Sequence, residues 1–598
     1  MTLRIAALVK QIPAFDEMTL GPDGRLVRAG LDLEMSAYCR RAVAQAVELA
    51  SAHGGSVTIL TLGPPTAEDV LREAIAWGID RDVDTDGVLV SDPAFAGSDT
   101  LATARALAAA LEVEGPFDVI LTGRNSIDAD TGQVGPEIAQ LVGLPFVTSA
   151  RHLTLTEGVL DIRAEHDDGW AQVRLSLPAV VSTAERLIDP CKVDPDGRAA
   201  VPTERIRVLT ATDLGSGPWG DAASPTRVGE TRHIPSARLG RRDPTAPIAA
   251  QVDAAIALLV ERRALSAGHD DDLDVGRVAD VADLLAVEIG VIVEPNRDRL
   301  TRELLGAARD LDASPVAIVT EALDADAIDE LGAWGADSIV HLEGVTLANE
   351  QDTAAGVVVW ARAIDPWAIL APGTAWGREV ASRTAAALMT GLTGDAVELD
   401  RDADDLVAWK PAFGGQIVAA IRCTTRPQMA TVRSGVLPRR APRTHTPPVT
   451  VIPLEPQSRV EILARTRDDD LDTLADAHVV VGVGVGVDPG EYPRLDPLLA
   501  ALGAELAATR KVTDQGWLPR ARQIGITGRT IAPRLYVSVA SNGKFNHMVG
   551  VRTAGTILAI NSDPDAKVFA AADIGIVGDY RDVVPLLVSR LTEPERGS

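Results

Sequence analysis

The chain has few of the residues that mark disulfide-stapled, redox-active or zinc-binding proteins. Only three cysteines occur in 598 residues, Cys39, Cys191 and Cys423. Their wide spacing excludes a CxxC redox motif and a zinc ribbon. We therefore expect three reduced thiols in a cytoplasmic protein, and we predict no metal site.

Aromatic residues are scarce too, at 3% of the chain, so the hydrophobic cores must be aliphatic. Positive charge is in deficit, because 57 Lys and Arg face 85 Asp and Glu for a net charge of −28. Such a protein repels nucleic acids and anionic membranes. No apolar run approaches the ~18 residues of a membrane span, and the run at residues 5–9 is too short for a secretory signal. We expect no nucleic-acid partner and no membrane insertion.

Catalytic motifs are also missing. The nine histidines are scattered, and the chain contains no GxSxG elbow, HExxH pair or GxxxxGK[ST] loop. The sequence thus gives no support for a hydrolase with an activated serine, a zinc protease or a P-loop enzyme. We predict no catalytic residue.

What is present is a steady alternation of short β-branched runs and longer amphipathic runs, which is typical of βαβ units around a parallel sheet. The length allows about four domains at most. The alternation predicts strands at residues 5–10, 56–62, 88–91 and 118–122, with helices at 38–51, 67–77 and 101–111. Residues 215–247 and the acidic run 269–274 look like linker or arm, although clustered Asp could bind a metal. A predicted helix at 248–265 between them could pack on either half.

The alternation of strands and helices begins again at residue 289. It predicts strands at 289–293, 316–320, 338–342 and 367–370 and helices at 300–311, 327–334, 354–363 and 378–392. Short strings recur as well: Ala76-Trp77-Gly78-Ile79-Asp80 returns as Ala333-Trp334-Gly335-Ala336-Asp337. The fold class is therefore α/β, with two homologous Rossmann-like parallel-sheet domains. After a linker-like stretch at 442–456, a third, doubly wound domain is predicted, with strands at 478–487, 535–539, 556–560 and 574–577 and helices at 495–509 and 582–591.

Three glycine-rich segments of the third domain could hold a ligand. The run Gly482 to Gly486 follows a strand but lacks the spacing of a dinucleotide fingerprint. The loop Gln523 to Arg529 is suited to wrapping a polar ligand with backbone N–H groups, and the segment Ser541 to His547 could offer a helix N-terminus to a phosphate. On these residues alone, a surface turn is an equally open interpretation of Gln523 to Arg529, and a structural role is the favoured interpretation of His547.

The order of these motifs resembles that of the electron transfer flavoprotein alpha subunit. Pro533-Arg534-Leu535-Tyr536 and Ala559-Ile560-Asn561-Ser562-Asp563-Pro564 belong to the string, and upstream Gly377-Arg378-Glu379 matches the same subunit. Residues 1 to about 265 resemble the beta subunit through Val9-Lys10-Gln11, Leu62-Gly63-Pro64 and residues 123–136. The resemblance implies a beta-like domain at 1–265, a linker at 266–284, an alpha-like domain at 285–450 and an FAD-binding domain at 456–598.

The resemblance also implies cofactors and site residues. FAD is expected in the C-terminal domain, with Arg510 over the isoalloxazine, Thr527 at its N5 edge and His547 at its N1/O2 edge. The full set implied for FAD is Thr509, Arg510, Gln523, Ile524, Gly525, Ile526, Thr527, Asn542, Gly543, Lys544, Phe545, Asn546, His547, Asn561 and Asp579. The set implied for AMP in the beta-like half is Leu62, Asp130, Thr131, Gly132, Gln133, Val134 and Gly135.

The sequence departs from the family at several of these positions. Val485 replaces an arginine in the glycine-rich strand exit, and Lys544 could supply the missing charge near the pyrophosphate. Ser36 to Cys39 replaces the family's Asn-Pro strip beside the AMP loop. A second FAD in place of AMP stays open, and so does a metal at Asp128 and Asp130, although a helix-cap pattern is the favoured interpretation there.

Three functions remain to be compared. The first is a non-catalytic electron carrier that takes electrons from a dedicated dehydrogenase, flavin-dependent or other, and passes them to a quinone reductase or similar acceptor. The second is a bifurcating module with two FAD that oxidises NADH. The third is an adenine-nucleotide sensor without flavin, which rests on fold alone.

Overall fold

The computed structural model describes residues 2–13, 32–126, 128–167, 169–233, 238–265, 278, 287–412, 417–467, 473–474, 477–525 and 528–592. The chain divides into two compact units. The first contains residues 1–232, 275–413 and 418–466, and the second contains residues 233–274, 414–417 and 467–598. Each unit is described by itself. Among the described residues, no helix is both long and apolar enough to cross a bilayer.

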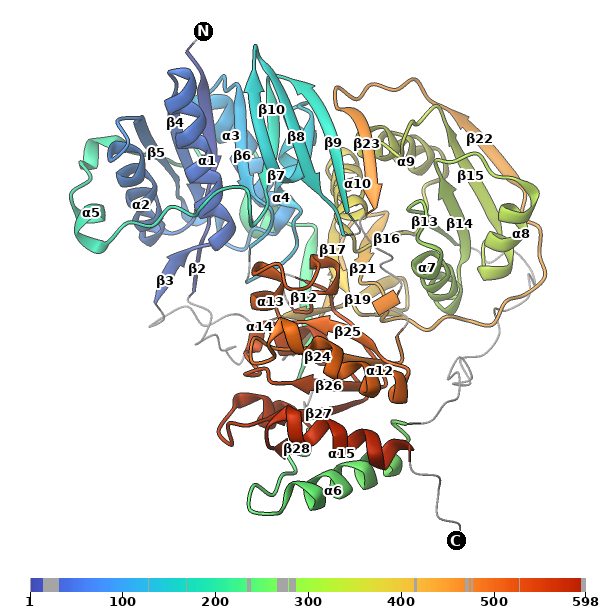
Figure 1. Ribbon diagram of the computed structural model, residues 1–598. Helices are drawn as coiled ribbons and strands as arrows, with labels where there is room; N and C mark the ends of the chain where they lie inside the picture. Colours follow the sequence, from blue (N-terminus) through green and yellow to red (C-terminus); the bar gives the residue numbers. More distant parts are fainter. Residues whose placement is uncertain are drawn as a thin grey trace. The chain divides into compact units, whose positions relative to one another are not determined.

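The first repeat is built on a ten-stranded sheet with the order β11-β5-β4-β1-β6-β10-β7-β8-β9-β23 (Figure 1). From β11 to β7 neighbouring strands are parallel, whereas β7, β8 and β9 are antiparallel. The strands are β1 (Arg4–Leu8), β4 (Ser56–Leu62), β5 (Asp84–Val90), β6 (Val119–Gly123), β7 (Phe146–Thr156), β8 (Val159–Glu165), β9 (Gly169–Ser176), β10 (Ala179–Thr183), β11 (Ile206–Leu209) and β23 (Glu461–Arg467). A separate small hairpin joins β2 (Gln11–Pro13) to β3 (Leu33–Met35).

Successive side chains of β1 enter two different cores. Ile5 and Ala7 belong to one buried cluster, and Ala6 and Leu8 belong to another on the opposite face. Because both faces of a parallel sheet are covered by helices, its strands are apolar without alternation. The crossover helices are α1 (Ala37–His53), α2 (Glu68–Ile79), α3 (Thr100–Glu114) and α4 (Val134–Leu141).

The second repeat has the same strand order. Its seven-stranded sheet runs β22-β15-β14-β13-β16-β21-β17, which matches β11-β5-β4-β1-β6-β10-β7 position by position. The prediction of two homologous domains is confirmed. The elements are β13 (Glu288–Ile292), α7 (Asp298–Asp310), β14 (Ser314–Val319), α8 (Ala325–Trp334), β15 (Ser338–Glu343), α9 (Glu350–Ile364), β16 (Ala368–Pro372), α10 (Ala375–Leu388), β17 (Leu392–Ala396), β21 (Gln428–Val432) and β22 (Val449–Pro453).

The two repeats exchange an edge strand. Strand β23, which follows the second repeat, pairs with β9 of the first repeat. Reciprocally, β12 (Thr226–His233), which follows the first repeat, joins a four-stranded sheet with the second repeat's β18 (Glu398–Asp402), β19 (Asp405–Ala412) and β20 (Ile417–Cys423), in the order β12-β20-β19-β18. Neither repeat completes its sheets with its own residues.

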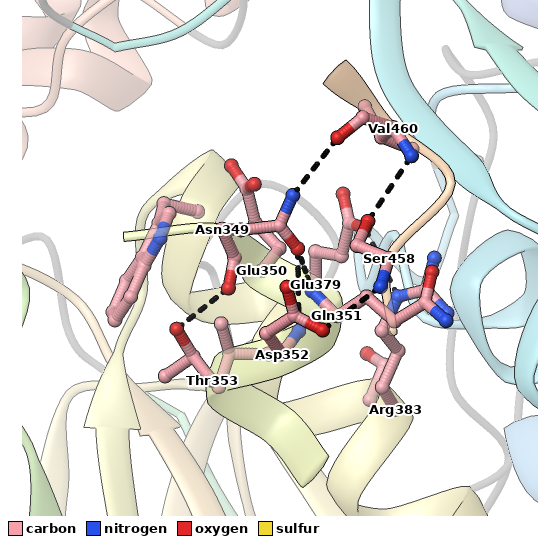
Figure 2. A network of polar contacts seen from close by, with 12 residues as sticks. Asn349, Glu350, Gln351, Asp352, Thr353, Glu379, Arg383, Ser458 and Val460 are labelled. Carbon is pink, nitrogen blue, oxygen red and sulfur yellow. Dashed lines mark hydrogen bonds and ion pairs between the residues drawn. The ribbon is translucent and has the colours of Figure 1, made fainter. Parts of the chain in front are cut away.

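Each exchanged strand is held by the N-cap region of an equivalent helix. The Asp99 carboxylate caps α3 and accepts hydrogen bonds from the backbone N and the hydroxyl of Thr226, at 3.0 and 2.8 Å. Asn349 caps α9 and donates to the carbonyl of Val460 at 3.3 Å, while Asp352 accepts from the backbone of Ser458 at 3.0 Å (Figure 2). The capping residue of each helix therefore also fixes the start of the other repeat's edge strand.

The second unit is a five-stranded parallel sheet with the order β25-β24-β26-β27-β28. This order confirms the predicted doubly wound domain. The elements are β24 (Val479–Val483), α12 (Asp496–Leu502), β25 (Glu505–Ala508), α13 (Arg510–Asp514), β26 (Leu535–Val539), α14 (Phe545–Met548), β27 (Thr556–Asn561), β28 (Ile574–Val577) and α15 (Tyr580–Thr592).

Helix α6 (Ile248–Glu261) packs on this second unit, which settles which half receives the predicted helix at 248–265. Val252 and Leu259 lie in one cluster with Val481 and Leu587, and α6 lies beside α15 (Figure 1). Arg238 donates to the buried carboxylate of Asp573 at 2.7 Å. The arm that follows the beta-like strands is thus part of the C-terminal domain's core.

Three element predictions were wrong. The stretch 215–247, predicted as linker or arm, contains the paired strand β12. Residues 442–456 are not all linker, since β22 pairs in parallel with β15 from Ile339 to Glu343. The predicted helix at 495–509 ends at Leu502, because Gly503 adopts a left-handed φ of 57° and the chain then continues as β25. The predicted domain boundaries stay predictions. Strand β23 lies in the first unit, although it follows residue 456, and residues 238–265 lie in the second.

Candidate functional site

The sheet of the second unit has a single reversal of strand order. From the central strand β24 the chain adds β25 on one side and then β26, β27 and β28 on the other. At such a reversal the loops leave in opposite directions and open a crevice outside the carboxyl ends of the strands, where doubly wound proteins bind ligands. This carboxyl edge is the candidate site.

Four groups of predicted FAD residues lie at this edge. Thr509 and Arg510 follow β25, Asn542, Gly543 and Lys544 follow β26, Asn561 ends β27, and Asp579 follows β28. Gln523 pairs with Ala508 at the end of β25, which brings Ile524 and Gly525 to the same edge. Ile526 and Thr527 lie outside the described residues, as do the side chains of Phe545 and Asn546.

The glycines of the edge are required by close backbone contacts. A Cβ on Gly484 would lie 2.2 Å from the carbonyl oxygen of Ala540, and Ala540 itself has a left-handed φ of 50°. Gly543 has a φ of 73°, and its Cβ would lie 2.2 Å from the Cα of Val568. In the Gly482 to Gly486 run, Gly484 and Gly486 therefore serve close packing of the turn after β26, whereas Gly482 makes room for Tyr536 within β26.

Arg510 and Lys544 supply positive charge at the edge. Arg510 begins α13 and donates to Asp514 at 3.2 Å, with 44% of its side chain exposed. Lys544 is exposed, and so is Val485, at the position where the family carries an arginine. A polar ligand with phosphates would find its cations on the loops after β25 and β26.

Three predicted ligand residues also organise the edge itself. The Asn561 amide donates to the carbonyl of Ser541 at 2.8 Å, so it ties the end of β27 to the turn after β26. The Gln523 carbonyl oxygen accepts from the hydroxyl of Thr513 at 2.7 Å. Asp579 accepts from the backbone N of Arg581 at 2.8 Å at the start of α15.

His547 is buried within the site, and both of its ring nitrogens have protein partners. Nε2 lies 2.7 Å from the hydroxyl of Tyr536, and Nδ1 lies 3.2 Å from the carbonyl oxygen of Ile524. Burial lowers the pKa of His547 to about 4, so the imidazole is neutral near pH 7. Its predicted place at the flavin N1/O2 edge stays a prediction, but a positively charged His547 is not what this geometry favours.

The predicted AMP loop lies before helix α4 in the first unit. Asp130 and Gly132 both have left-handed backbones, with φ of 48° and 67°, and Gln133 is the buried N-cap position. A Cβ on Gly135 would lie 3.0 Å from the Phe146 ring, so α4 approaches the sheet closely. Leu62 is partly buried at the carboxyl end of β4, and Thr131 and Val134 complete the loop.

Two buried oxygens near this loop lack hydrogen-bond partners among the described residues. They are Oγ1 of Thr122, at the end of β6, and Oδ1 of Asn125, whose amide nitrogen donates to Asp130. Buried polar atoms are normally satisfied, so such a pair fits a site that receives a polar ligand. The Asp128 carboxylate pairs with Lys10 at 2.8 Å, and the described residues contain no group of three or more potential metal ligands.

The second repeat contributes two cations, Arg378 and Lys410, that are not in the set predicted for AMP. Arg378 lies near the loop, because a Cβ on Gly132 would be 3.9 Å from its Cδ. Lys410 donates a hydrogen bond to the carbonyl of Gly394. Gly394 in turn lies against Gln133, since a Cβ on Gly394 would be 3.0 Å from the Gln133 side chain. Burial lowers the pKa of Lys410, and Asp395 opposes that shift. Arg378 occurs in a matched motif, but no local signal marks Lys410, which reaches the loop from a strand 280 residues downstream of Asp130.

Comparison with known families identifies the family of both units. The electron transfer flavoprotein domain matches residues 23–211 and 290–457, and the electron transfer flavoprotein FAD-binding domain matches residues 473–552. The chain belongs to the electron transfer flavoprotein family. The FAD-binding domain match covers the part of the carboxyl edge formed after β25 and β26.

Individual relatives of both subunits match this one chain. The electron transfer flavoprotein subunit alpha of Thermoanaerobacterium thermosaccharolyticum is 34% identical over 322 residues, covering 51% of this chain and 97% of that protein. Subunit beta of the same organism is 33% identical over 242 residues, covering 40% of this chain and 91% of that protein. The resemblance to both subunits in one polypeptide is confirmed.

A third relative has a more specialised description. The lactate dehydrogenase (NAD(+),ferredoxin) subunit LctC of Acetobacterium woodii is 33% identical over 311 residues, which cover 50% of this chain and 74% of that protein. The name of this relative contains both NAD(+) and ferredoxin. That relative is the reason to keep a bifurcating role as a testable alternative.

Proposed function

We propose that this electron transfer flavoprotein is an FAD-containing carrier that accepts electrons from a dedicated dehydrogenase and passes them to a quinone reductase or another redox acceptor. The observation that supports the proposal is the cluster of family-matched polar residues at the carboxyl edge, where strand order reverses. Bound FAD would supply the redox chemistry, since no side chain of the protein stores electrons there.

The residues present fit such a cofactor. Gly484 and Gly543 let the turn after β26 pack against neighbouring backbone. Backbone N–H groups at such a turn would suit a pyrophosphate. Lys544 and Arg510 provide the charge that Val485 does not. A cation beside a flavin favours the reduced, more negative form, so these residues would set the potential at which electrons enter and leave.

For the loop before α4 we propose AMP, held by Asp130 to Gly135 and completed by Arg378. Support comes from the helix start, the orphaned oxygens of Thr122 and Asn125, and the nearby cations. The alternative is a second FAD at this loop and NADH oxidation, which the match to LctC makes worth testing.

One experiment tests both assignments. The purified chain is expected to be yellow, and extraction of its nucleotides is expected to give one FAD and one AMP per polypeptide. Two FAD per polypeptide would favour bifurcation. A colourless chain that cannot be reconstituted with FAD would refute the carrier proposal.

A matched pair of variants locates the flavin. Gly484→Ala places a methyl group 2.2 Å from the Ala540 carbonyl oxygen, so we expect it to lose FAD while retaining AMP. Gly490→Ala meets only the movable carboxylate of Asp488, at 3.2 Å, and is the control that should retain both nucleotides. Retention of FAD by Gly484→Ala at the wild-type affinity would place the flavin elsewhere.

A further inference from the structure

Tyr536 is the one fully buried phenol of the described part of the second unit. It lies on β26, and its hydroxyl is 2.7 Å from Nε2 of His547. The space for the phenol is made by Gly482 on the neighbouring strand, where a Cβ would lie 1.8 Å from the Tyr536 oxygen. Gly482 and Tyr536 thus form a fitted pair directly beneath the turn that carries His547.

The partners of His547 fix the positions of its protons. A carbonyl oxygen can only accept, so Nδ1 must carry the hydrogen that is donated to Ile524. The neutral ring then has a lone pair on Nε2, and the Tyr536 hydroxyl donates to it. Burial raises the pKa of Tyr536, so the phenol keeps the proton that it donates.

We propose that Tyr536 is a positioning residue that holds His547 in the neutral Nδ1–H tautomer, so that the imidazole joins strand β26 to the loop carrying Ile524. The bond from Tyr536 stabilises the ring without a proton on Nε2, and the bond to Ile524 uses the only N–H that remains. His547 therefore has no N–H left for a ligand at the carboxyl edge.

The consequence concerns the flavin site and rests on the proposed function. If FAD binds at this edge, His547 acts on it through the shape of the loop and not through charge or hydrogen bonding. The pKa of about 4 agrees with this role, because burial is its first cause and no charged side chain contributes to it. The ring then has the same protonation state throughout pH 5–8.

The test is nitrogen NMR of the full chain labelled in its histidines, with His547→Gln to assign the resonance. We expect the Nδ1–H pattern for His547 and no titration between pH 5 and 8, and the titration is continued below pH 5 to measure the pKa itself. Tyr536→Phe removes only the hydroxyl, so we expect the pKa of His547 to rise by about half to one unit and the tautomer to become mixed. FAD should also dissociate faster from this variant, since the loop that carries His547 loses its hydrogen bond to Tyr536 on β26.

Tyr492→Phe is the matched control. Tyr492 lies in the same unit, and its buried hydroxyl has no hydrogen-bond partner among the residues that the structure describes. Removing that hydroxyl should leave the His547 signal unchanged. An Nε2–H tautomer in the wild type, or a His547 pKa that is the same in Tyr536→Phe and in the wild type, would overturn the proposal. Because the NMR readout needs no flavin, a flavin-free protein would refute the carrier function and still leave the tautomer measurable.

Discussion

Arg510 is the residue whose charge is best placed to act on a ligand at the carboxyl edge. It begins α13 directly after β25, and nearly half of its side chain is exposed. Solvent therefore screens its charge, and its effect on a flavin should be at the low end of what a neighbouring cation contributes.

We predict that Arg510→Ala lowers the reduction potential of the flavin. Loss of the cation disfavours the reduced form by about 1 kcal/mol, and Arg510→Lys should recover most of the wild-type potential. The measurement is a spectroelectrochemical titration. Arg590→Ala, at the far end of α15, is the control and should leave the potential unchanged. Overlapping titrations of Arg510→Ala and the wild type would move the flavin away from Arg510.

The sequence could identify residues at the site but not all of their partners. The family resemblance is enough to name Thr509, Lys544 and Asp579, and in the structure each follows a strand that ends at the same edge of the sheet. The hydrogen bond between Tyr536 and His547 could not be predicted, since it depends on the phenol occupying the space that Gly482 leaves on the neighbouring strand. Motif similarity gives a residue's place along the chain, whereas its protonation follows from burial and partners.

The sequence predicts helix α6 itself but not the domain on which it packs. Its apolar face, with Val252, Ala255 and Leu259, is clear in the sequence, but such a face fits any apolar surface of similar shape. The deciding contacts are polar. Gln251 exchanges hydrogen bonds with the backbone of Val577, and Arg238 reaches Asp573.

We predict that Asp573→Ala destabilises the second unit by about 3–5 kcal/mol. The variant leaves Arg238, which is only 10% exposed, without its carboxylate and also removes the acceptor for the backbone N of Ile557. Asp253→Ala is the control, because it breaks only the exposed pair with Arg590 and should cost about 0–1 kcal/mol. Denaturant unfolding of the full chain compares the two. Equal losses would mean that the arm is not anchored through Asp573.

The missed strands have local causes. Strand β25 was missed because Ala and Leu are frequent on both sides of Gly503, which gives the whole stretch a helical pattern. In the structure the helix ends before Gly503 and the strand follows it. Strand β22 has prolines on both sides, and its burial is low because it is the edge strand of its sheet. Edge strands carry a weak hydrophobic pattern, so neither length nor alternation marks them.

For the whole molecule, the choice of electron-donating dehydrogenase is expected to depend on a position where this sequence differs from its family. Family members that serve acyl-CoA dehydrogenases are expected to present a leucine anchor where Pro195 stands here. In the structure Val193 and Val201 are buried and hold the two ends of α5 (Pro195–Ala199), and Pro195 between them is exposed. The loop is therefore held at both ends, and it has a proline at the position of the family's leucine.

We predict slow electron transfer from a generic medium-chain acyl-CoA dehydrogenase and faster transfer after Pro195→Leu. A buried apolar anchor contributes roughly 2 kcal/mol or more to such an interface, which corresponds to a gain of about thirtyfold in affinity. Asp194 keeps the loop in place by accepting from the backbone of Gly197, so the variant should retain the turn. Stopped-flow reduction of the flavin is the measurement, with Ala199→Leu on the same loop as the control. Wild-type rates equal to those of an ordinary family member would refute the prediction.

The exchanged strands also mean that, during synthesis on the ribosome, β9 is made long before the strand that pairs with it. Strand β9 ends at Ser176, but its partner β23 begins at Glu461, 285 residues later. At ~5–20 residues per second, synthesis takes roughly 15 seconds to a minute to reach it. Through that interval the β9 edge has backbone N–H and C=O groups with no strand to pair with, and such an edge can join the strands of neighbouring nascent chains. Slower translation would lengthen this exposure, whereas a chaperone bound to the β9 edge would protect it until β23 is made.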